Sequence, residues 1–242
     1  MYLSIIIPAY NEEKRIPSTL KEIDLYLRTQ TYEYEIIVVN DGSKDGTAGV
    51  VNGLISEIKN LKLIDNKENH GKGFVTRQGL SEAKGEYRLF TDADNSTSID
   101  QVEKMLPEFK KGYDIIIGSR DIKGAILIPA QPMIRRFLGE VFGFLTNFLC
   151  GTWGLMDTQC GFKGMTKGSV DKVIPKCRID RFAFDPEILA VSKKFGFKIK
   201  EIPVTWKNDL ASTVKFSGMV KMGLDLLKIR WDLISGKYND KK

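Results

Sequence analysis

Short apolar runs and helix-like stretches alternate regularly over the first 120 residues of this chain. Five runs bounded by turn-forming residues have the composition of buried parallel strands, namely residues 3–7, 36–39, 61–64, 86–91 and 115–118. Between them, four stretches carry apolar residues at helical spacing, namely residues 12–28, 50–58, 71–83 and 98–112. This alternation predicts an α/β fold, a doubly wound and mostly parallel sheet with helices on both faces.

The bulk composition is that of a globular protein. With 242 residues, 42% of them hydrophobic and 28% charged, the chain can bury a sizeable core. No window approaches the ~20 apolar residues of a membrane-spanning helix, and the N-terminus runs into a predicted strand, so we expect no secretory signal. The cysteines Cys150, Cys160 and Cys177 lack metal-ligand spacing, which favours free thiols in a reducing compartment.

Two carboxylates stand where the fourth apolar run ends, in the triplet Asp92-Ala93-Asp94. Carboxylates one residue apart at a strand end can share one hard divalent cation and leave coordination positions for substrate phosphates. Such triplets also occur by chance in acidic loops, so this one needs support from its surroundings. Two other polar strand ends, residues 8–12 and 40–43, supply it, because right-handed crossovers bring all three to one rim of the sheet.

The residues at this rim suit a nucleoside diphosphate held through a divalent metal. The ring of Tyr10 can lie against a base, and the carboxylate of Asp41 can accept a hydrogen bond from a base N–H. Each polar residue also has a structural alternative, since Asp41-Gly42 suits a turn, and Asn11 and Ser43 suit helix N-caps. Their joint occurrence at successive strand ends favours the ligand site.

Several other nucleotide-binding classes are disfavoured. No Gly-x-Gly-x-x-Gly follows the first predicted strand and no Gly-Lys-Ser/Thr loop is present, which argues against dinucleotide oxidoreductases and P-loop NTPases. A sugar nucleotidyltransferase would carry a glycine-rich, basic phosphate loop after the first strand, and residues 8–12 contain none. The single histidine, His70, makes chemistry built on histidine pairs improbable.

Two further helices are expected in the second half. Residues 133–150 are unusually apolar behind Arg135 and Arg136, and predict either a core helix or a helix at a membrane interface. Residues 216–234 predict an amphipathic helix whose apolar stripe closes on the core, the stripe being Phe216, Met219, Val220, Leu227, Trp231 and Ile234. We expect residues 237–242 to be frayed.

Positive charge is concentrated near the C-terminus. The last 50 residues carry 12 Lys and Arg against 5 Asp and Glu, whereas the formal charge of the whole chain is +6. A basic tail on a near-neutral body suits either an anionic partner, such as lipid headgroups or nucleic acid, or a solvated basic face.

The motifs together resemble a known enzyme family, the inverting family 2 glycosyltransferases with the GT-A fold. The resemblance rests on Pro8-Ala9-Tyr10-Asn11-Glu12, Asn40-Asp41-Gly42-Ser43-Lys44-Asp45-Gly46-Thr47, Gly71-Lys72-Gly73 and Asp92-Ala93-Asp94. Later stretches resemble the polyprenyl-phosphate sugar synthases: Gly118-Ser119-Arg120, Asp157-Thr158-Gln159-Cys160-Gly161-Phe162-Lys163, Phe184-Asp185-Pro186-Glu187 and Glu201-Ile202-Pro203-Val204-Thr205-Trp206. Residues 222–230 are most similar to the dolichyl-phosphate β-glucosyltransferase type.

Two departures from the family pattern stand out. Asn40 occupies a position where the family often has Asp, although Asp41 remains. The N-terminal membrane helix of the eukaryotic glucosyl enzymes is absent, so we expect peripheral contact with the cytoplasmic face of a membrane.

The resemblance implies a GT-A fold, which is a Rossmann-like doubly wound sheet, followed by C-terminal amphipathic or interfacial helices. Residues 1–120 would form the half that binds the nucleotide-sugar. Residues 121–215 would form the acceptor-binding part of the same catalytic domain, including the interfacial helix 133–150. Residues 216–242 would add an amphipathic helix and a basic tail.

The resemblance also implies roles for individual residues. Asp92 and Asp94 are the expected ligands of Mg²⁺ or Mn²⁺. Nucleotide contacts are implied for Pro8, Tyr10, Glu12, Val39, Asp41, Asp92, Ala93 and Lys215. Donor-sugar contacts are implied for Asp157 and Gln159, and the candidate catalytic residues are Asp94, Arg120 and Asp185. We expect Arg135 and Arg136 to grip the acceptor phosphate, because a guanidinium fork matches phosphate geometry.

The expected reaction moves a sugar, glucose by resemblance, from a UDP-sugar to a dolichyl or polyprenyl phosphate. The second pKa of a phosphate monoester is about 6, so the acceptor is mostly dianionic at neutral pH and needs no general base. Direct displacement at an α-linked donor, with a metal stabilising the leaving diphosphate, gives a β-linked product. Asp185 is then either a sugar contact or, since Pro186 follows it, a helix N-cap.

The sequence leaves alternatives open for the donor, the acceptor and the class of function. Glucose is favoured by resemblance, but GDP-mannose or UDP-N-acetylglucosamine as the donor would need only a few pocket changes. A family 2 enzyme acting on a carbohydrate or protein hydroxyl would need a base, for which Asp185 is the candidate. A non-catalytic module that binds nucleotide or RNA is disfavoured, because aromatic residues do not interleave with the basic ones, and we expect no nucleic-acid partner.

Overall fold

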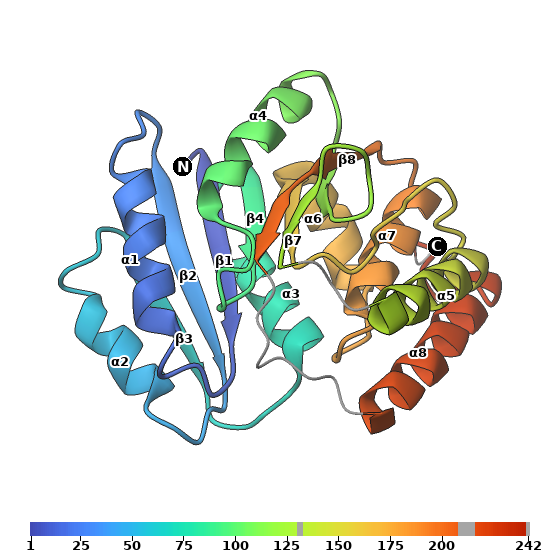
Figure 1. Ribbon diagram of the computed structural model, residues 1–242, viewed down its shortest axis with the longest axis horizontal. Helices are drawn as coiled ribbons and strands as arrows, with labels where there is room; N and C mark the ends of the chain where they lie inside the picture. Colours follow the sequence, from blue (N-terminus) through green and yellow to red (C-terminus); the bar gives the residue numbers. More distant parts are fainter. Residues whose placement is uncertain (130–132, 208–215, 241–242) are drawn as a thin grey trace.

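A seven-stranded sheet forms the centre of the molecule (Figure 1). The computed structural model describes residues 1–129, 133–207 and 216–240, and only the backbone of 133–138, 216, 217 and 219. The strands are β1 (Leu3–Ala9), β2 (Tyr34–Asp41), β3 (Leu61–Asn66), β4 (Tyr87–Thr91), β5 (Ile115–Ser119), β7 (Phe162–Thr166) and β8 (Ile199–Pro203). Their order in the sheet is β3-β2-β1-β4-β7-β5-β8. A second, two-stranded sheet pairs β6 (Ile126–Ile128) with β9 (Thr205–Lys207).

Helices cover both faces of the large sheet, as the alternating pattern predicts. One face packs against α1 (Ile16–Leu27), α2 (Thr47–Leu54) and α4 (Val102–Lys110), which follows the 3₁₀ turn η1 (Ile99–Gln101). The other face packs against α3 (Lys72–Glu82), α6 (Lys167–Val173), the 3₁₀ turn η2 (Ile174–Lys176) and α7 (Phe184–Lys194). The apolar residues of the strands are therefore buried from both sides, which explains their continuous Ile and Val runs.

One antiparallel strand interrupts the otherwise parallel sheet. β7 lies between β4 and β5 and runs antiparallel to both, while the other adjacent pairs are parallel. Its register places Phe162 opposite Thr91, the residue before Asp92. A segment from the second half of the chain is thereby brought beside the end of β4, and the sheet draws its strands from both halves.

Two long helices lie side by side at one end of the molecule, α5 (Met133–Cys150) and α8 (Phe216–Ile234) (Figure 1). They pack with α7 around a third apolar cluster made of Cys150, Ile179, Ala183, Ala190, Leu226 and Ile229. Both helices have the bounds expected from the sequence. In the described part of the chain, no helix combines the length and the apolar character needed to cross a bilayer.

The expectation for the apolar stripe of α8 is wrong. Met222, Leu226 and Ile229 are the residues that turn inward. The stripe residues whose side chains are described, Val220, Leu227, Trp231 and Ile234, are 50 to 66% exposed. The helix is apolar on two sides, and its shorter, less aromatic side faces the core.

The expectation of a frayed tail is also wrong for the residues that the structure describes. Tyr238 is fully buried, and its hydroxyl donates a hydrogen bond of 2.7 Å to Glu187 on α7. Asp240 forms ion pairs with Lys172 and Lys176. The chain beyond α8 is therefore fastened to α6, η2 and α7.

Candidate functional site

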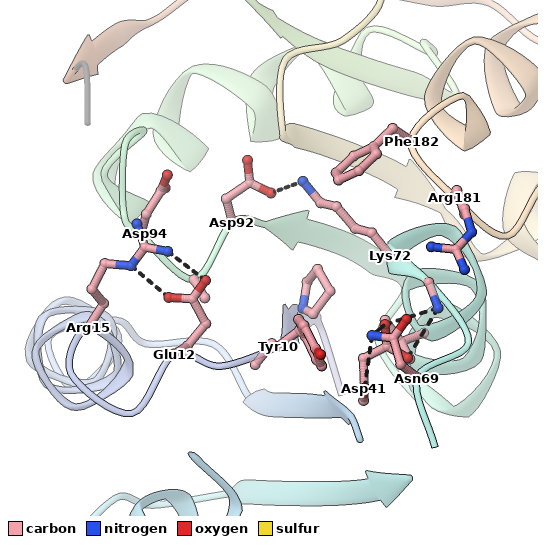
Figure 2. A pocket seen from close by; sticks show the side chains of 15 residues that line it. Tyr10, Glu12, Arg15, Asp41, Asn69, Lys72, Asp92, Asp94, Arg181 and Phe182 are labelled. Atoms are coloured by element: carbon pink, nitrogen blue, oxygen red, sulfur yellow. Dashed lines mark hydrogen bonds and ion pairs between the residues drawn. The ribbon is translucent and has the colours of Figure 1, made fainter. Parts of the chain in front are cut away.

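A pocket of about 390 Å³ opens at the carboxyl ends of β1, β2 and β4 (Figure 2). Its lining includes seven residues expected from the sequence, namely Pro8, Tyr10, Glu12, Asp41, Asp92, Ala93 and Asp94. Residues of three separate loops thus meet at one rim, as the crossover rule requires. The volume falls in the range of small-ligand sites, roughly 300–1,000 Å³.

The loop after β1 is tied to the loop after β2. The Asn11 backbone N–H donates to Ser43 Oγ at 2.9 Å, and the Lys44 N–H donates to Asn11 Oδ1 at 2.8 Å. Neither Asn11 nor Ser43 is a helix N-cap, since Arg15 precedes α1 and Gly46 precedes α2. These polar residues instead hold the two loops together. Tyr10, in the first of these loops, is 41% exposed and lines the pocket.

Asp41 fastens the chain that leads into α3. Its carboxylate accepts hydrogen bonds from Asn69 Nδ2 at 2.9 Å, from the His70 N–H at 2.7 Å and from the Gly71 N–H at 3.0 Å. Gly71 has a φ of +103°, and a Cβ there would collide with the Asp180 carbonyl oxygen, so only glycine fits. Asp41 therefore orders one wall of the pocket in addition to bordering it.

Acidic side chains crowd the opposite wall. Glu12 accepts two hydrogen bonds of 2.7 Å from Arg15, and Asp92 accepts one of 2.5 Å from Lys72 Nζ (Figure 2). Burial, together with repulsion from Asp92, raises the pKa of Asp94. Burial also raises the pKa of Glu12, and the nearby Asp94 and Asp92 add to this rise despite the Arg15 pair. The wall carries an excess of negative charge that a cation would relieve.

The donor set fits a hard divalent cation. Asp92 and Asp94 offer only oxygen ligands, and the Lys72 ammonium on Asp92 shows that a cation is accepted at this position. Within the described residues no group of three His, Cys, Asp or Glu side chains is arranged around one point. The remaining ligands of a metal held here would have to come from substrate phosphates and water.

Arg120 and Asp157 form an ion pair outside the residues that line the pocket, with Asp157 buried and Arg120 half-buried. Arg120 Nε and Nη2 donate to the two Asp157 oxygens at 2.7 and 2.9 Å, and the Arg120 backbone N–H donates to the same carboxylate. The guanidinium also lies 5.4 Å from the Trp206 ring. Burial would raise the pKa of Asp157, but the Arg120 charge outweighs it and lowers that pKa.

Gln159 belongs to the same cluster. Its backbone N–H donates to Asp157 Oδ1 at 3.2 Å, while the Asp157 N–H donates to Glu201 at 3.0 Å. The expected donor-sugar residues are thus brought together with Arg120, and the Asp157 carboxylate accepts hydrogen bonds from Arg120 and from the Gln159 backbone. Val39 is fully buried in β2, beside Pro8 in register, and does not line the pocket.

Asp185 is not a helix N-cap. α7 begins at Phe184 with Ala183 as its N-cap, and the Asp185 carboxylate accepts a 2.5 Å hydrogen bond from Lys163 Nζ. The N-cap expectation failed because a buried lysine from β7 offers the carboxylate a stronger partner than a helix N–H does. Burial raises the pKa of Asp185, although Lys163 and Lys72 oppose the rise.

The pocket also contains residues that the sequence did not single out. Arg15, Asn69, Arg181 and Phe182 line it, as does Lys72 from the Gly71-Lys72-Gly73 motif. Arg181 and Phe182 come from the loop before α7, which is held by an ion pair between Arg77 and Asp180. Only the fold brings this distant loop to the rim. The side chains of Arg135 and Arg136, and all of Lys215, lie outside the described residues.

Comparison with known proteins gives a consistent answer over the whole chain. Residues 4–174 match the family described as glycosyl transferase family 2. Dolichyl-phosphate beta-glucosyltransferase ALG5A of Trichomonas vaginalis is 40% identical over 240 residues, which cover 95% of this chain and 73% of that protein. Dolichyl-phosphate beta-glucosyltransferase of Homo sapiens is 35% identical over 250 residues, covering 98% and 77%.

Solved structures confirm the expected fold. Mannosyl-3-phosphoglycerate synthase from Rubrobacter xylanophilus superposes with a TM-score of 0.70 at 17% identity, covering 100% of this chain and 77% of that one. Glucosyl-3-phosphoglycerate synthase from Mycobacterium tuberculosis, in complex with Mn²⁺, UDP and glucosyl-3-phosphoglycerate, gives 0.67 at 14% identity, covering 100% and 81%. With the whole-length relatives and the rim pocket, these findings establish that the chain belongs to family 2 of the glycosyltransferases and is a glycosyltransferase of the GT-A fold.

Proposed function

We propose that this enzyme transfers glucose from UDP-glucose to a dolichyl or polyprenyl phosphate and releases UDP. The observation that carries the proposal is the Asp92 and Asp94 pair in the lining of the rim pocket, in a chain of which 95% or more matches named dolichyl-phosphate glucosyltransferases. The volume and the acidic wall suit a nucleoside diphosphate bound with a divalent cation. Mg²⁺ and Mn²⁺ are the two cations that we propose for it.

Different residues of the pocket contact different parts of the donor. Tyr10 offers an exposed ring against which the base can lie, and Asp41 keeps the wall at residues 69–71 in place. Asp92 and Asp94 would hold the metal, whose positive charge would stabilise the leaving diphosphate. The Arg120 and Asp157 pair positions the segment around Gln159.

The acceptor supplies its own nucleophile. A lipid monophosphate is mostly dianionic at neutral pH, so one of its oxygens can attack the anomeric carbon while the bond to UDP breaks. No proton has to be removed, which agrees with a site in which the Asp185 carboxylate is already held by Lys163. Attack from the side opposite the leaving group turns an α-linked donor into a β-linked product.

Exposed apolar side chains on α5, on the loop that follows it and on α8 suit a lipid acceptor. We call them together the apolar face, and its members are Val141, Phe144, Leu145, Phe148, Trp153, Met156, Val220, Leu224, Leu227, Trp231 and Ile234, all at least 43% exposed. Exposed apolar groups in this number are unusual for a surface that meets only water. We propose that the apolar face rests on the cytoplasmic side of a membrane, where the acceptor is embedded.

Transfer from radiolabelled UDP-glucose to a short-chain polyprenyl phosphate tests the proposal. The expected product is extracted into organic solvent, requires Mg²⁺ or Mn²⁺, and disappears with EDTA or in Asp94→Ala. Asp240→Ala, which changes an exposed carboxylate at the far end of the chain, is the matched control and should keep full activity. If the lipid product forms from GDP-mannose or UDP-N-acetylglucosamine and not from UDP-glucose, the proposed donor is wrong. Absence of any lipid product despite UDP binding would refute the acceptor.

A further inference from the structure

Lys72 occupies an oxygen that the metal needs. Its ammonium crosses the pocket from α3 and donates a 2.5 Å hydrogen bond to Asp92 Oδ1 (Figure 2). A divalent cation bound by Asp92 competes for the same carboxylate, because an ammonium and a metal both take its lone pairs. The Lys72 ammonium and a divalent cation therefore weaken each other's binding to this oxygen of Asp92.

The backbone around Lys72 is fixed by hydrogen bonds, so only its side chain can move when a cation binds Asp92. The Gly71 N–H is bound by Asp41, and the Gly73 and Phe74 N–H groups donate to the Asp180 carbonyl at 2.7 and 3.1 Å. Lys72 is the first residue of α3, and the lysine side chain has four rotatable bonds. Its ammonium can leave Asp92 only by swinging within the pocket.

The Asp92 carboxylate has little room of its own. A Cβ at position 161 would overlap it, so the Gly161 backbone lies directly against one side of Asp92. Lys72 lies at the other oxygen. A cation that approaches Asp92 from the pocket therefore meets the Lys72 ammonium, and Asp92 cannot turn away to offer a different approach.

The ordinary lysine pKa of about 10.4 keeps an ammonium displaced from Asp92 positively charged at neutral pH. Such an ammonium needs a new anionic partner, and the diphosphate of a bound nucleotide is the anion that enters this pocket.

We propose that Lys72 and the divalent cation exchange places on Asp92, the cation taking the carboxylate oxygen while the Lys72 ammonium turns to the diphosphate. This inference rests on the proposed function, since it needs a nucleoside diphosphate and a metal in the same pocket. It makes Lys72 a donor-binding residue that opposes metal binding while the nucleotide is absent. Metal and nucleotide then bind better together than singly.

Lys72→Met tests the exchange, because it keeps an unbranched side chain only one atom shorter and removes the charge. Mn²⁺ affinity without nucleotide, measured by electron paramagnetic resonance, is expected to rise about tenfold in Lys72→Met, since the competing ammonium is gone. UDP affinity at saturating Mn²⁺, measured by titration calorimetry, is expected to fall by about the same factor. Lys111→Met removes a lysine paired with Glu108 on α4 and is expected to change neither value.

The two opposite shifts distinguish the exchange from simpler roles. A Lys72→Met variant that binds Mn²⁺ no more tightly than the parent overturns the exchange, and so does one that binds UDP equally well. If the parent itself binds no UDP with Mn²⁺, the proposed function fails first. A measurement on the unaltered protein guards against misfolding of the variant. The ¹³C signal of the Lys72 ε-carbon should shift when Mg²⁺ and UDP are added together, and an unmoved signal overturns the exchange.

Discussion

The Lys163 ammonium lies 2.5 Å from the Asp185 carboxylate, and both side chains are buried. Lys163 also donates to the Cys160 carbonyl oxygen and lies 5.4 Å from the Phe90 ring. The pair links β7 to α7 and places a charge-balanced unit next to the acidic wall of the pocket. Asp185 is therefore a structural partner of Lys163, and a base role would require this pair to break.

Asp185→Asn is expected to destabilise the protein without abolishing turnover. Removing one charge of a buried pair leaves the other uncompensated, which costs about 3–5 kcal/mol in the free energy of unfolding. Urea denaturation measures this loss, and the double variant Lys163→Met/Asp185→Leu is expected to be more stable than Asp185→Asn. The rate at saturating lipid phosphate should stay within about tenfold of the parent. A fall of 10²–10⁴, the usual contribution of a general base, would instead identify Asp185 as that base.

Asp157→Asn is expected to reveal the pH range over which the pair of Arg120 and Asp157 stabilises the folded protein. The pKa of Asp157 is lowered in the folded state, so the unfolded chain binds more protons between the two pKa values. Stability from this pair is therefore complete above the ordinary aspartate pKa of about 3.9 and is lost as the pH falls through the lower, folded value. The stability gap between the parent and Asp157→Asn should be constant from about pH 7 to pH 5 and close only below about pH 4.

Chemical denaturation at each pH measures that gap. Asp171→Asn is the matched control, because its carboxylate is 56% exposed and 3.4 Å from Arg88. Because this carboxylate is largely exposed to water and its contact with Arg88 is long, the stability gap between the parent and Asp171→Asn should be small at every pH. A gap for Asp157→Asn that already closes near neutral pH would contradict the lowered pKa.

The rim of the sheet was predictable because it depends on local rules. Strands, crossovers and turn residues place Tyr10, Asp41 and Asp92 at one edge whatever the rest of the chain does. The same rules do not place Arg181 and Phe182, since their arrival depends on β7 entering between β4 and β5 as an antiparallel strand. Nothing local in residues 162–166 encodes that insertion.

Two further errors have a common physical origin. The sequence around Asp185 fits an N-cap, but a buried ammonium from another element competes for the carboxylate and prevails. α8 is apolar on two sides, and the side that packs is decided by α5 and α7 rather than by its own pattern. Helix existence is thus a local property, whereas helix orientation and side-chain partners are set by tertiary contacts.

Tyr238→Phe is expected to loosen the pocket-lining loop before α7. The Tyr238 hydroxyl and the N–H groups of Arg178 and Ile179 donate to one carboxylate, that of Glu187, at 2.7 to 2.8 Å. Loss of one donor to a buried carboxylate costs about 1–3 kcal/mol. Amide exchange of residues 178–182 should accelerate. Asp240→Ala, which removes only exposed ion pairs of the same tail, should leave that exchange rate unchanged.

The double variant Leu227→Ser/Trp231→Ser is expected to weaken membrane binding while leaving the fold intact. Both side chains are more than half exposed, so their loss removes little buried area from the protein. If the apolar face enters the bilayer surface, the loss of two large apolar groups should lower partitioning onto phosphatidylcholine–phosphatidylserine vesicles by tenfold or more, about 1.4 kcal/mol or above. Sedimentation with vesicles measures this.

Leu25→Ser is the matched control, because Leu25 is 71% exposed on α1, a helix that contributes nothing to the apolar face. Its partitioning should equal that of the parent. Equal partitioning of the double variant would show that α8 does not enter the membrane, and Phe144 and Phe148 on α5 would then be the residues to change. A loss shared by both variants would indicate general destabilisation, so each thermal transition is measured beside the vesicle assay. If the thermal transitions are unchanged, a loss of vesicle binding in the double variant alone places the lipid at the apolar face.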